Sequence, residues 1–168
     1  MKKTLAILSC LVLAFALVSC GGGGSSTSFT LDTKALIDEL HGANLFIDSL
    51  SPISENALNK VVGVSTDGIT DFTYEMGTGV TGEELAVITC DSEDSAKKVF
   101  EEVTAHREDY MKQYESYAPD ALPRMENAVL VQKGVYVIYV SAENDAEAQS
   151  IVDTYLKYTG SRINVGVA

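Results

Sequence analysis

A cysteine at position 20, followed by four glycines, limits which part of this chain can fold as a domain. Lys2 and Lys3 precede an apolar stretch from Leu5 to Val18. A positive start, a short apolar segment and a small residue before the cut are typical of a secretory signal peptide. As a helix, the fourteen residues of this stretch would rise only about 21 Å, too little for a hydrocarbon core of roughly 30 Å. We therefore predict that residues 1–19 are a signal peptide rather than a membrane span.

The four residues Leu17-Val18-Ser19-Cys20 resemble the lipobox of bacterial lipoproteins. In that family the cysteine becomes the first mature residue and carries lipid, palmitate among its acyl chains. The resemblance implies that Cys20 is the lipid attachment site and that the protein stays on the extracytoplasmic face of the cell membrane, with full release as the alternative. Residues 20–28 are then the lipidated cysteine and a flexible Gly/Ser tether. Phe29 stands nine residues after Cys20, so the tether spans roughly 15–18 Å.

The remaining residues, 29–168, suffice for one hydrophobic core and are predicted to form a single domain. The whole chain has a net charge of −12, and loss of Lys2 and Lys3 with the signal peptide makes it −14. A surface this acidic repels phosphate backbones and anionic lipid headgroups, which disfavours nucleic-acid binding and electrostatic docking to a membrane. With Cys20 lipidated and the signal peptide removed, Cys90 has no partner for an internal disulfide.

Hydrophobic periodicity and capping residues predict a mixed fold. Four segments are typical of helices: 32–42, 55–61, 92–118 and 144–160. Four are typical of strands: 72–76, 85–88, 128–132 and 135–141. Because the strands come in pairs and each pair precedes a long helix, we predict the α+β class. The expected architecture is a four-stranded antiparallel sheet from two ββα units with helices packed on it, plus two short N-terminal helices.

The predicted strand Val135–Val140 is apolar on both faces, so both faces need a cover. If the two long helices cover one face, the N-terminal helices of 32–61 can lie across the other. The alternative is an exposed apolar face in which Tyr136 and Ile138 are available to a partner. The sequence leaves both possibilities open.

Several residue patterns suggest catalysis or cofactor binding, but the segments around them lack the structure that such sites need. Gly77–Gly82 spells GxGxxG after a predicted strand, but a dinucleotide site needs a helix at the third glycine, and an acidic, β-branched segment follows instead. A hairpin loop is the better interpretation. His41 and His106 have no partners at metal-ligand spacing, and Cys90 has no evident activating base. We predict neither a metal nor a cofactor.

Arg107 lies in the apolar stripe of the long predicted helix, between Val103 and Tyr110. A charge in this position is costly unless it is paired. Glu84, at the start of a predicted buried strand, is the expected partner. A structural ion pair is the first interpretation, and recognition of a ligand through Arg107 is the alternative.

Several short segments together resemble a family of small bacterial lipoproteins known as domain of unknown function 4358. They are GEELAV from Gly82, the Arg107 helix up to Tyr117 and Pro119, ENAV from Glu126, and KGVYV from Lys133. Glu84, Arg107 and Gly134 fall where the family usually has the same residue type, whereas Val135 replaces a usual polar residue. The resemblance covers residues 31–156 and implies a lipid anchor and an α+β domain, but no activity.

Two functions remain open, and whether the protein is an enzyme stays undecided. The favoured hypothesis is a non-catalytic binding or scaffolding module of the cell envelope, whose partner is a protein, a peptide or a glycan. The alternative is a small envelope hydrolase that uses acids such as Glu83, Glu84 or Asp91. That reaction requires two carboxylates about 5–9.5 Å apart in a cleft.

Overall fold

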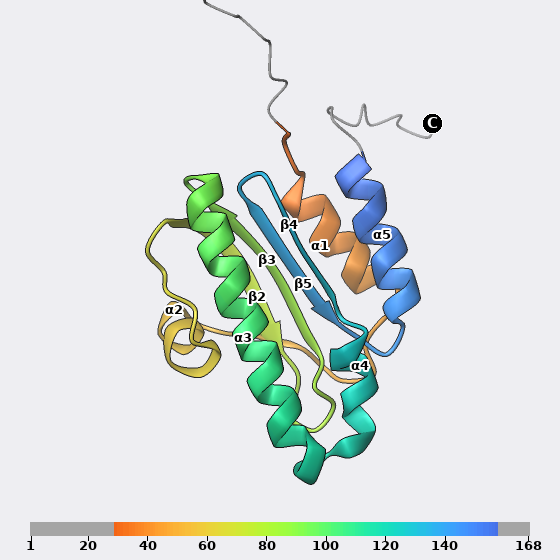
Figure 1. Ribbon diagram of the computed structural model, residues 1–168. Coiled ribbons are helices and arrows are strands. Elements are labelled where there is room, and N and C mark those ends of the chain that lie inside the picture. Colours follow the sequence, from red (N-terminus) through yellow and green to blue (C-terminus); the bar gives the residue numbers. More distant parts are fainter. Residues whose placement is uncertain (1–28, 158–168) are drawn as a thin grey trace, which may run out of the picture.

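The structure is a computed structural model that describes residues 29–157, which form an α+β domain (Figure 1). In chain order, its elements are α1 (Thr33–Gly42), β1 (Ser51–Pro52), α2 (Glu55–Ala57), η1 (Leu58–Val62), β2 (Ile69–Met76), β3 (Glu84–Cys90), α3 (Glu93–Tyr117), η2 (Pro119–Ala121), α4 (Leu122–Glu126), β4 (Val129–Lys133), β5 (Tyr136–Ser141) and α5 (Asp145–Lys157). The element η1 is a π-helix, and η2 is a 3-10 turn. The predicted signal peptide, Cys20 and the tether lie outside the described residues.

Within residues 29–157 the sheet has five strands, all paired antiparallel, in the order β1-β2-β3-β5-β4. Two hairpins, β2–β3 and β4–β5, join side by side through β3 and β5. The long helix α3 follows the first hairpin and α5 follows the second, so the predicted α+β class and the two ββα units are present. Gly134, with a φ of 57°, supplies the left-handed conformation that the tight turn between β4 and β5 requires.

The prediction of four strands and two short N-terminal helices is wrong in detail, since the described residues contain five strands and five α-helices. The additional strand β1 pairs only with Glu75 and Met76. A strand of two residues, one of them proline, has no alternating pattern that sequence analysis can detect. The helix predicted for 55–61 is one turn of α-helix that continues as the π-helix η1. The sequence does not reveal α4 because Pro119 and Pro123 are read as the end of the long helix, although proline is also favourable in a first turn, as Pro123 is in α4.

Local signals explain where the principal helices begin and end. The side chain of Asp32 accepts a hydrogen bond from the Ala35 N–H at 3.0 Å and caps α1. Ser92 caps α3 in the same way, at 3.2 Å from the N–H of Ser95. The helix α3 runs for 25 residues, about 37 Å, and ends shortly before Pro119, which cannot continue it.

Helices cover both faces of the sheet, with α3 on one side and α1 and α5 together on the other (Figure 1). Because side chains alternate along a strand, Ala86 and Ile88 of β3 face α3, whereas Leu85 and Val87 face α1 and α5. The two long helices therefore do not share one face, which was the condition under which the N-terminal helices alone would cover the other.

The alternative of an exposed apolar sheet face, which the sequence leaves open, does not hold for Tyr136 and Ile138. Ile138 is only 1% exposed and belongs to the core under α1 and α5. Tyr136 is partly buried, with its ring edge-to-face against Phe29 at 5.7 Å between centroids. Of the N-terminal helices, α1 covers this face as expected, but Leu58 and Val62 place η1 in the core on the α3 side.

Candidate functional site

A polar cluster lies buried between the sheet and α3, formed by Tyr74 of β2, Glu84 of β3 and His106 of α3. The Tyr74 hydroxyl donates a hydrogen bond to Glu84 Oε2 at 2.5 Å. His106 Nε2 lies 3.0 Å from Oε1 of the same carboxyl group. The side chains of Glu84 and His106 are each 3% exposed. Since these three polar groups satisfy one another inside the protein, the cluster connects the β2–β3 hairpin to α3.

The tyrosines around this cluster are held in their neutral form. Burial, with the nearby charge of Glu84, raises the pKa of Tyr74 well above its usual value. The same two causes raise the pKa of Tyr139, while the positive charge of Arg107 opposes the rise. Both phenols therefore remain protonated at neutral pH, and Tyr74 stays a hydrogen-bond donor.

The predicted ion pair between Glu84 and Arg107 is wrong, because Glu84 binds Tyr74 and His106 instead. Successive residues of a helix differ in direction by about 100°, so His106 faces the sheet while Arg107 points to the flank of α3. The Nε atom of Arg107 is buried and has no hydrogen-bond partner among the described residues.

His106 is considered from the sequence only as a metal ligand, and its place in the buried cluster is not predicted. It follows Val103 by three positions and precedes Tyr110 by four, which is the spacing of one helix face. Its ring contacts that of Tyr110, with centroids 4.3 Å apart. This spacing could have placed His106 in the interior, but only the packing of α3 on β3 identifies Glu84 as its partner.

The side chains of the three acids in the hydrolase hypothesis, Glu83, Glu84 and Asp91, point to different parts of the domain. Glu83 accepts hydrogen bonds from three backbone N–H groups in the adjoining loops, at 2.8 to 3.1 Å. Glu84 belongs to the polar cluster, and Asp91 accepts a hydrogen bond from the Ser95 hydroxyl at the start of α3. Because Glu83 and Glu84 are neighbours at the start of a strand, they point in opposite directions. The structure does not bring together the carboxylate pair that the hydrolase hypothesis requires.

The segment Gly77–Gly82 is a hairpin loop between β2 and β3, as predicted. Asp48 accepts hydrogen bonds from the N–H and hydroxyl of Thr78, at 2.7 and 2.6 Å, and from the hydroxyl of Thr81 at 3.1 Å. The bonds from Thr78 are the main cause that lowers the pKa of Asp48 to about 2. The Thr78 N–H, which lies in the glycine-rich loop where a dinucleotide phosphate would bind, thus already donates to the Asp48 carboxylate.

One edge of the sheet is open. The short strand β1 pairs with β2 at Glu75 and Met76, and the Ile53 N–H adds one hydrogen bond to the Tyr74 carbonyl at 2.9 Å. On the side of β2 that faces away from β3, no strand of residues 29–157 lies beside its first part, Ile69–Thr73. We call this segment the free β2 edge. Such an edge presents backbone N–H and C=O groups to the solvent.

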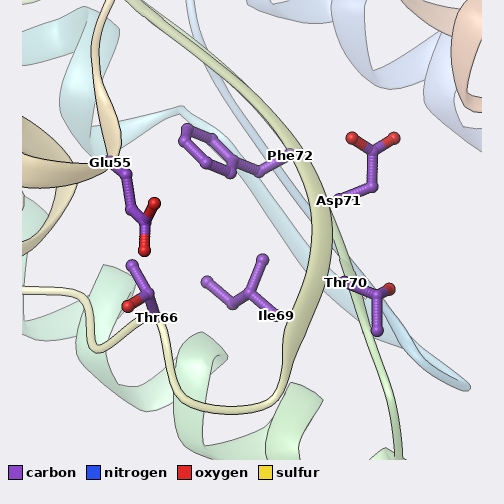
Figure 2. A pocket seen from close by; sticks show the side chains of 6 residues that line it. All are labelled: Glu55, Thr66, Ile69, Thr70, Asp71 and Phe72. Carbon is purple, nitrogen blue, oxygen red and sulfur yellow. The ribbon is translucent and has the colours of Figure 1, made fainter.

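A hollow of about 270 Å³ adjoins the free β2 edge (Figure 2). Its lining residues come from α2, the loop before β2 and β2 itself: Glu55, Thr66, Ile69, Thr70, Asp71 and Phe72. The side chains of Glu55, Ile69 and Phe72 point toward one another, whereas Thr70 and Asp71 lie on the opposite side of the strand (Figure 2). The hollow therefore combines an apolar wall with a carboxylate, beside a sheet edge that can pair.

Three further properties of residues 29–157 bear on function. No helix there combines the length and apolar character needed to cross a membrane. The same residues contain no group of three or more His, Cys, Asp or Glu side chains that could hold a metal ion. Cys90 is a buried free thiol, and burial together with the charge of Asp91 raises its pKa to about 11.

Residues 46–142 match the family described as Domain of unknown function (DUF4358). The match covers more than half of the chain and includes all five described strands, the polar cluster and the free β2 edge. It is shorter than the resemblance to residues 31–156, because α1 and α5 lie outside it. No curated protein and no solved structure matches the chain.

Proposed function

The chain belongs to the family described as Domain of unknown function (DUF4358), and we propose that it is a non-catalytic binding module of the cell envelope. Lipid at Cys20 anchors it to the extracytoplasmic face of the cell membrane, and its protein or peptide partner docks at the free β2 edge, Ile69–Thr73. The open edge is the observation that carries the proposal. Because helices cover both faces of the sheet, unpaired strand groups are available at an edge rather than on a face.

The positions of the acids and histidine in the core support a binding role. Glu84 and His106 bind each other in the interior, and Glu83 is occupied by backbone N–H groups. These residues hold strands, loops and α3 together. In this arrangement they stabilise the scaffold that presents the β2 edge.

The place where the tether reaches the domain also supports the proposal. Phe29 packs against Tyr136, and the Lys133 ammonium lies 4.4 Å from the centre of its ring. Phe29 therefore lies next to the β4–β5 turn, whereas β2 is on the far side of β3 and β5 in the strand order. A lipidated tether that enters at this point leaves the free β2 edge accessible. Acyl chains hold such an acidic domain at the membrane without any basic surface.

Replacing Cys20 tests the anchor. We expect Cys20→Ser to abolish incorporation of a palmitate analogue and to move the protein from the membrane fraction to the soluble fraction. Cys90→Ser is the matched control, because Cys90 is buried in the domain, and it should keep both labelling and membrane attachment. Unchanged labelling of Cys20→Ser would contradict lipid attachment at this residue.

Photo-crosslinking in intact cells tests the docking surface. A photoreactive residue at Thr70, which is exposed at the free β2 edge, should capture one partner, identified by mass spectrometry. The same residue at Lys97, which is exposed on α3, should not capture it. Ile138 is unsuitable for such a probe because it is buried. Equal capture at both positions, or capture at neither, would refute docking at this edge.

A further inference from the structure

We propose that the occupant of the free β2 edge is an extended peptide segment carrying lysine or arginine, which adds to the sheet as a further antiparallel or parallel strand. The inference rests on the proposed function for the location of the site, and it adds the chemistry of the partner. Strand addition of this kind derives affinity from backbone hydrogen bonds and specificity from pockets for alternate side chains.

The register of the sheet identifies the backbone groups that would pair. Along an antiparallel strand, successive residues direct their N–H and C=O groups to opposite sides. The Gly77 N–H donates to the Glu83 carbonyl at 2.9 Å, so the odd-numbered residues just before it in β2 face β3. The Tyr74 carbonyl accepts from Ile53 and thus faces the β1 side. Phe72, two residues earlier, faces the same side, where β1 does not reach.

The hollow indicates which side chain the added strand carries. Side chains of a strand alternate between its two faces, so every second residue of the peptide would lie toward the hollow. Ile69 and Phe72 form an apolar wall for a methylene stem, and the Glu55 carboxylate can receive the ammonium or guanidinium group at its end. Asp71, on the opposite side of β2, can attract a second basic side chain.

The charges at this edge are available. None of the ion pairs among residues 29–157 includes Glu55 or Asp71. The whole chain carries a net charge of −12, which attracts basic segments over a long range and repels acidic ones. The opposite edge of the sheet, formed by β4, differs in that its charged group is already bound: the Lys133 ammonium donates to the Leu156 carbonyl. Both α3 and α5 also contact β4.

Fluorescence anisotropy with the lipidated protein in non-ionic detergent tests the inference. The probe is a labelled eight-residue peptide of alternating lysine and valine. Two peptides of the same length are compared with it: one has glutamate in place of lysine, and the other is N-methylated at every internal residue. We expect the lysine peptide to bind and both others to bind at least tenfold more weakly, because they lose the charge attraction or the backbone hydrogen bonds.

Isosteric variants locate the peptide on the domain. Glu55→Gln and Asp71→Asn should each weaken binding of the lysine peptide about two- to fivefold, which is the value of an exposed ion pair. Asp67→Asn is the matched control, because Asp67 is an exposed acid near β2 that does not line the hollow, and it should change binding less than twofold. Unchanged circular dichroism would show that all three variants fold.

Several results would overturn the inference. They are absence of binding of the lysine peptide, equal binding of the glutamate or N-methylated peptide, and an equal effect of Asp67→Asn and Asp71→Asn. If any of these occurred while Thr70 still captured a partner in cells, the proposed docking edge would stand and only the partner's chemistry would be wrong. Loss of the Cys20 lipid, by contrast, would not change the peptide measurements.

Discussion

Replacing Tyr74 by phenylalanine tests whether the polar cluster stabilises the fold. The change removes the hydroxyl that donates to Glu84 at 2.5 Å and keeps the ring, so no large cavity forms. A hydrogen bond to a charged group contributes about 1.5–3 kcal/mol. Since Tyr74 and Glu84 are both almost fully buried, water cannot replace the hydroxyl easily. We expect the free energy of unfolding to fall by about 1.5–3 kcal/mol and Tm to fall by about 5–10 °C.

Urea unfolding followed by circular dichroism measures this loss, and an unchanged m-value would show that the comparison is valid. Tyr155→Phe is a matched control. The Tyr155 hydroxyl also donates to a carboxylate, Glu39 Oε2 at 2.7 Å, but at a partly buried position between α5 and α1. There we expect a smaller loss of about 0.5–1.5 kcal/mol.

A double-mutant cycle separates the hydrogen bond from other effects of the substitution. Tyr74→Phe and Glu84→Gln should be coupled by about 1–2 kcal/mol, because the two side chains are in direct contact. A loss below about 0.5 kcal/mol for Tyr74→Phe, or the absence of coupling to Glu84, would refute the reasoning that this cluster holds the strands and α3 together.

Four further outcomes are expected. The pKa of Asp48 is about 2 in the folded state and near 4 when unfolded, so its stabilising effect is complete above about pH 4 and disappears as the pH falls toward 2. In urea titrations, the unfolding free energy of Asp48→Asn should therefore fall less between pH 4 and 2 than that of the original protein. Burial raises the pKa of Cys90 to about 11, so the contribution of the neutral thiol to stability is complete below about pH 9 and disappears between pH 9 and 11. A thiol reagent at pH 8 should react fully with Cys90 only after denaturation. Gly82→Ala should lower the unfolding free energy by about 1–2 kcal/mol, because φ at Gly82 is +68° and the new Cβ would lie 2.9 Å from the methyl group of Met125. Gly42→Ala is the control: a Cβ there meets open space, so this loss should not occur. Arg107→Met keeps an apolar stem and removes the buried Nε that has no hydrogen-bond partner, so thermal unfolding should show unchanged or slightly raised stability. A large loss of stability would mean that the guanidinium charge is paired in solution.

Local features of this protein are predictable because the interactions that cause them lie within a few residues. Asp32 and Ser92 cap their helices with their own side chains, and Gly134 turns the hairpin through its own φ angle. The alternation of Phe72, Tyr74 and Met76 indicates a strand with one apolar face, and these three residues do belong to the core on the α3 side. The hairpin loop at Gly77–Gly82 follows from the same short-range reasoning.

The errors concern interactions between segments that are distant in the sequence. A stripe on a helix shows that the helix packs, but not on which face of the sheet. Only the tertiary structure decides that α3 and α5 lie on opposite faces. Arg107 and His106 are adjacent in the chain, and only the rotation of α3 against β3 decides that His106 meets Glu84. The pair of residues in β1 becomes a strand only because Glu75 and Met76 lie beside it.

The amino-acid sequence by itself determined the family and most helices and hairpins, because each of these depends on short contiguous patterns; the lipid anchor at Cys20 stays a prediction from such a pattern. The tertiary structure decided the partners of Glu84, the burial of Ile138 and the free β2 edge. These properties depend on where strands stop pairing and how helices lie on the sheet, which are set by the packing of the whole core rather than by any one segment.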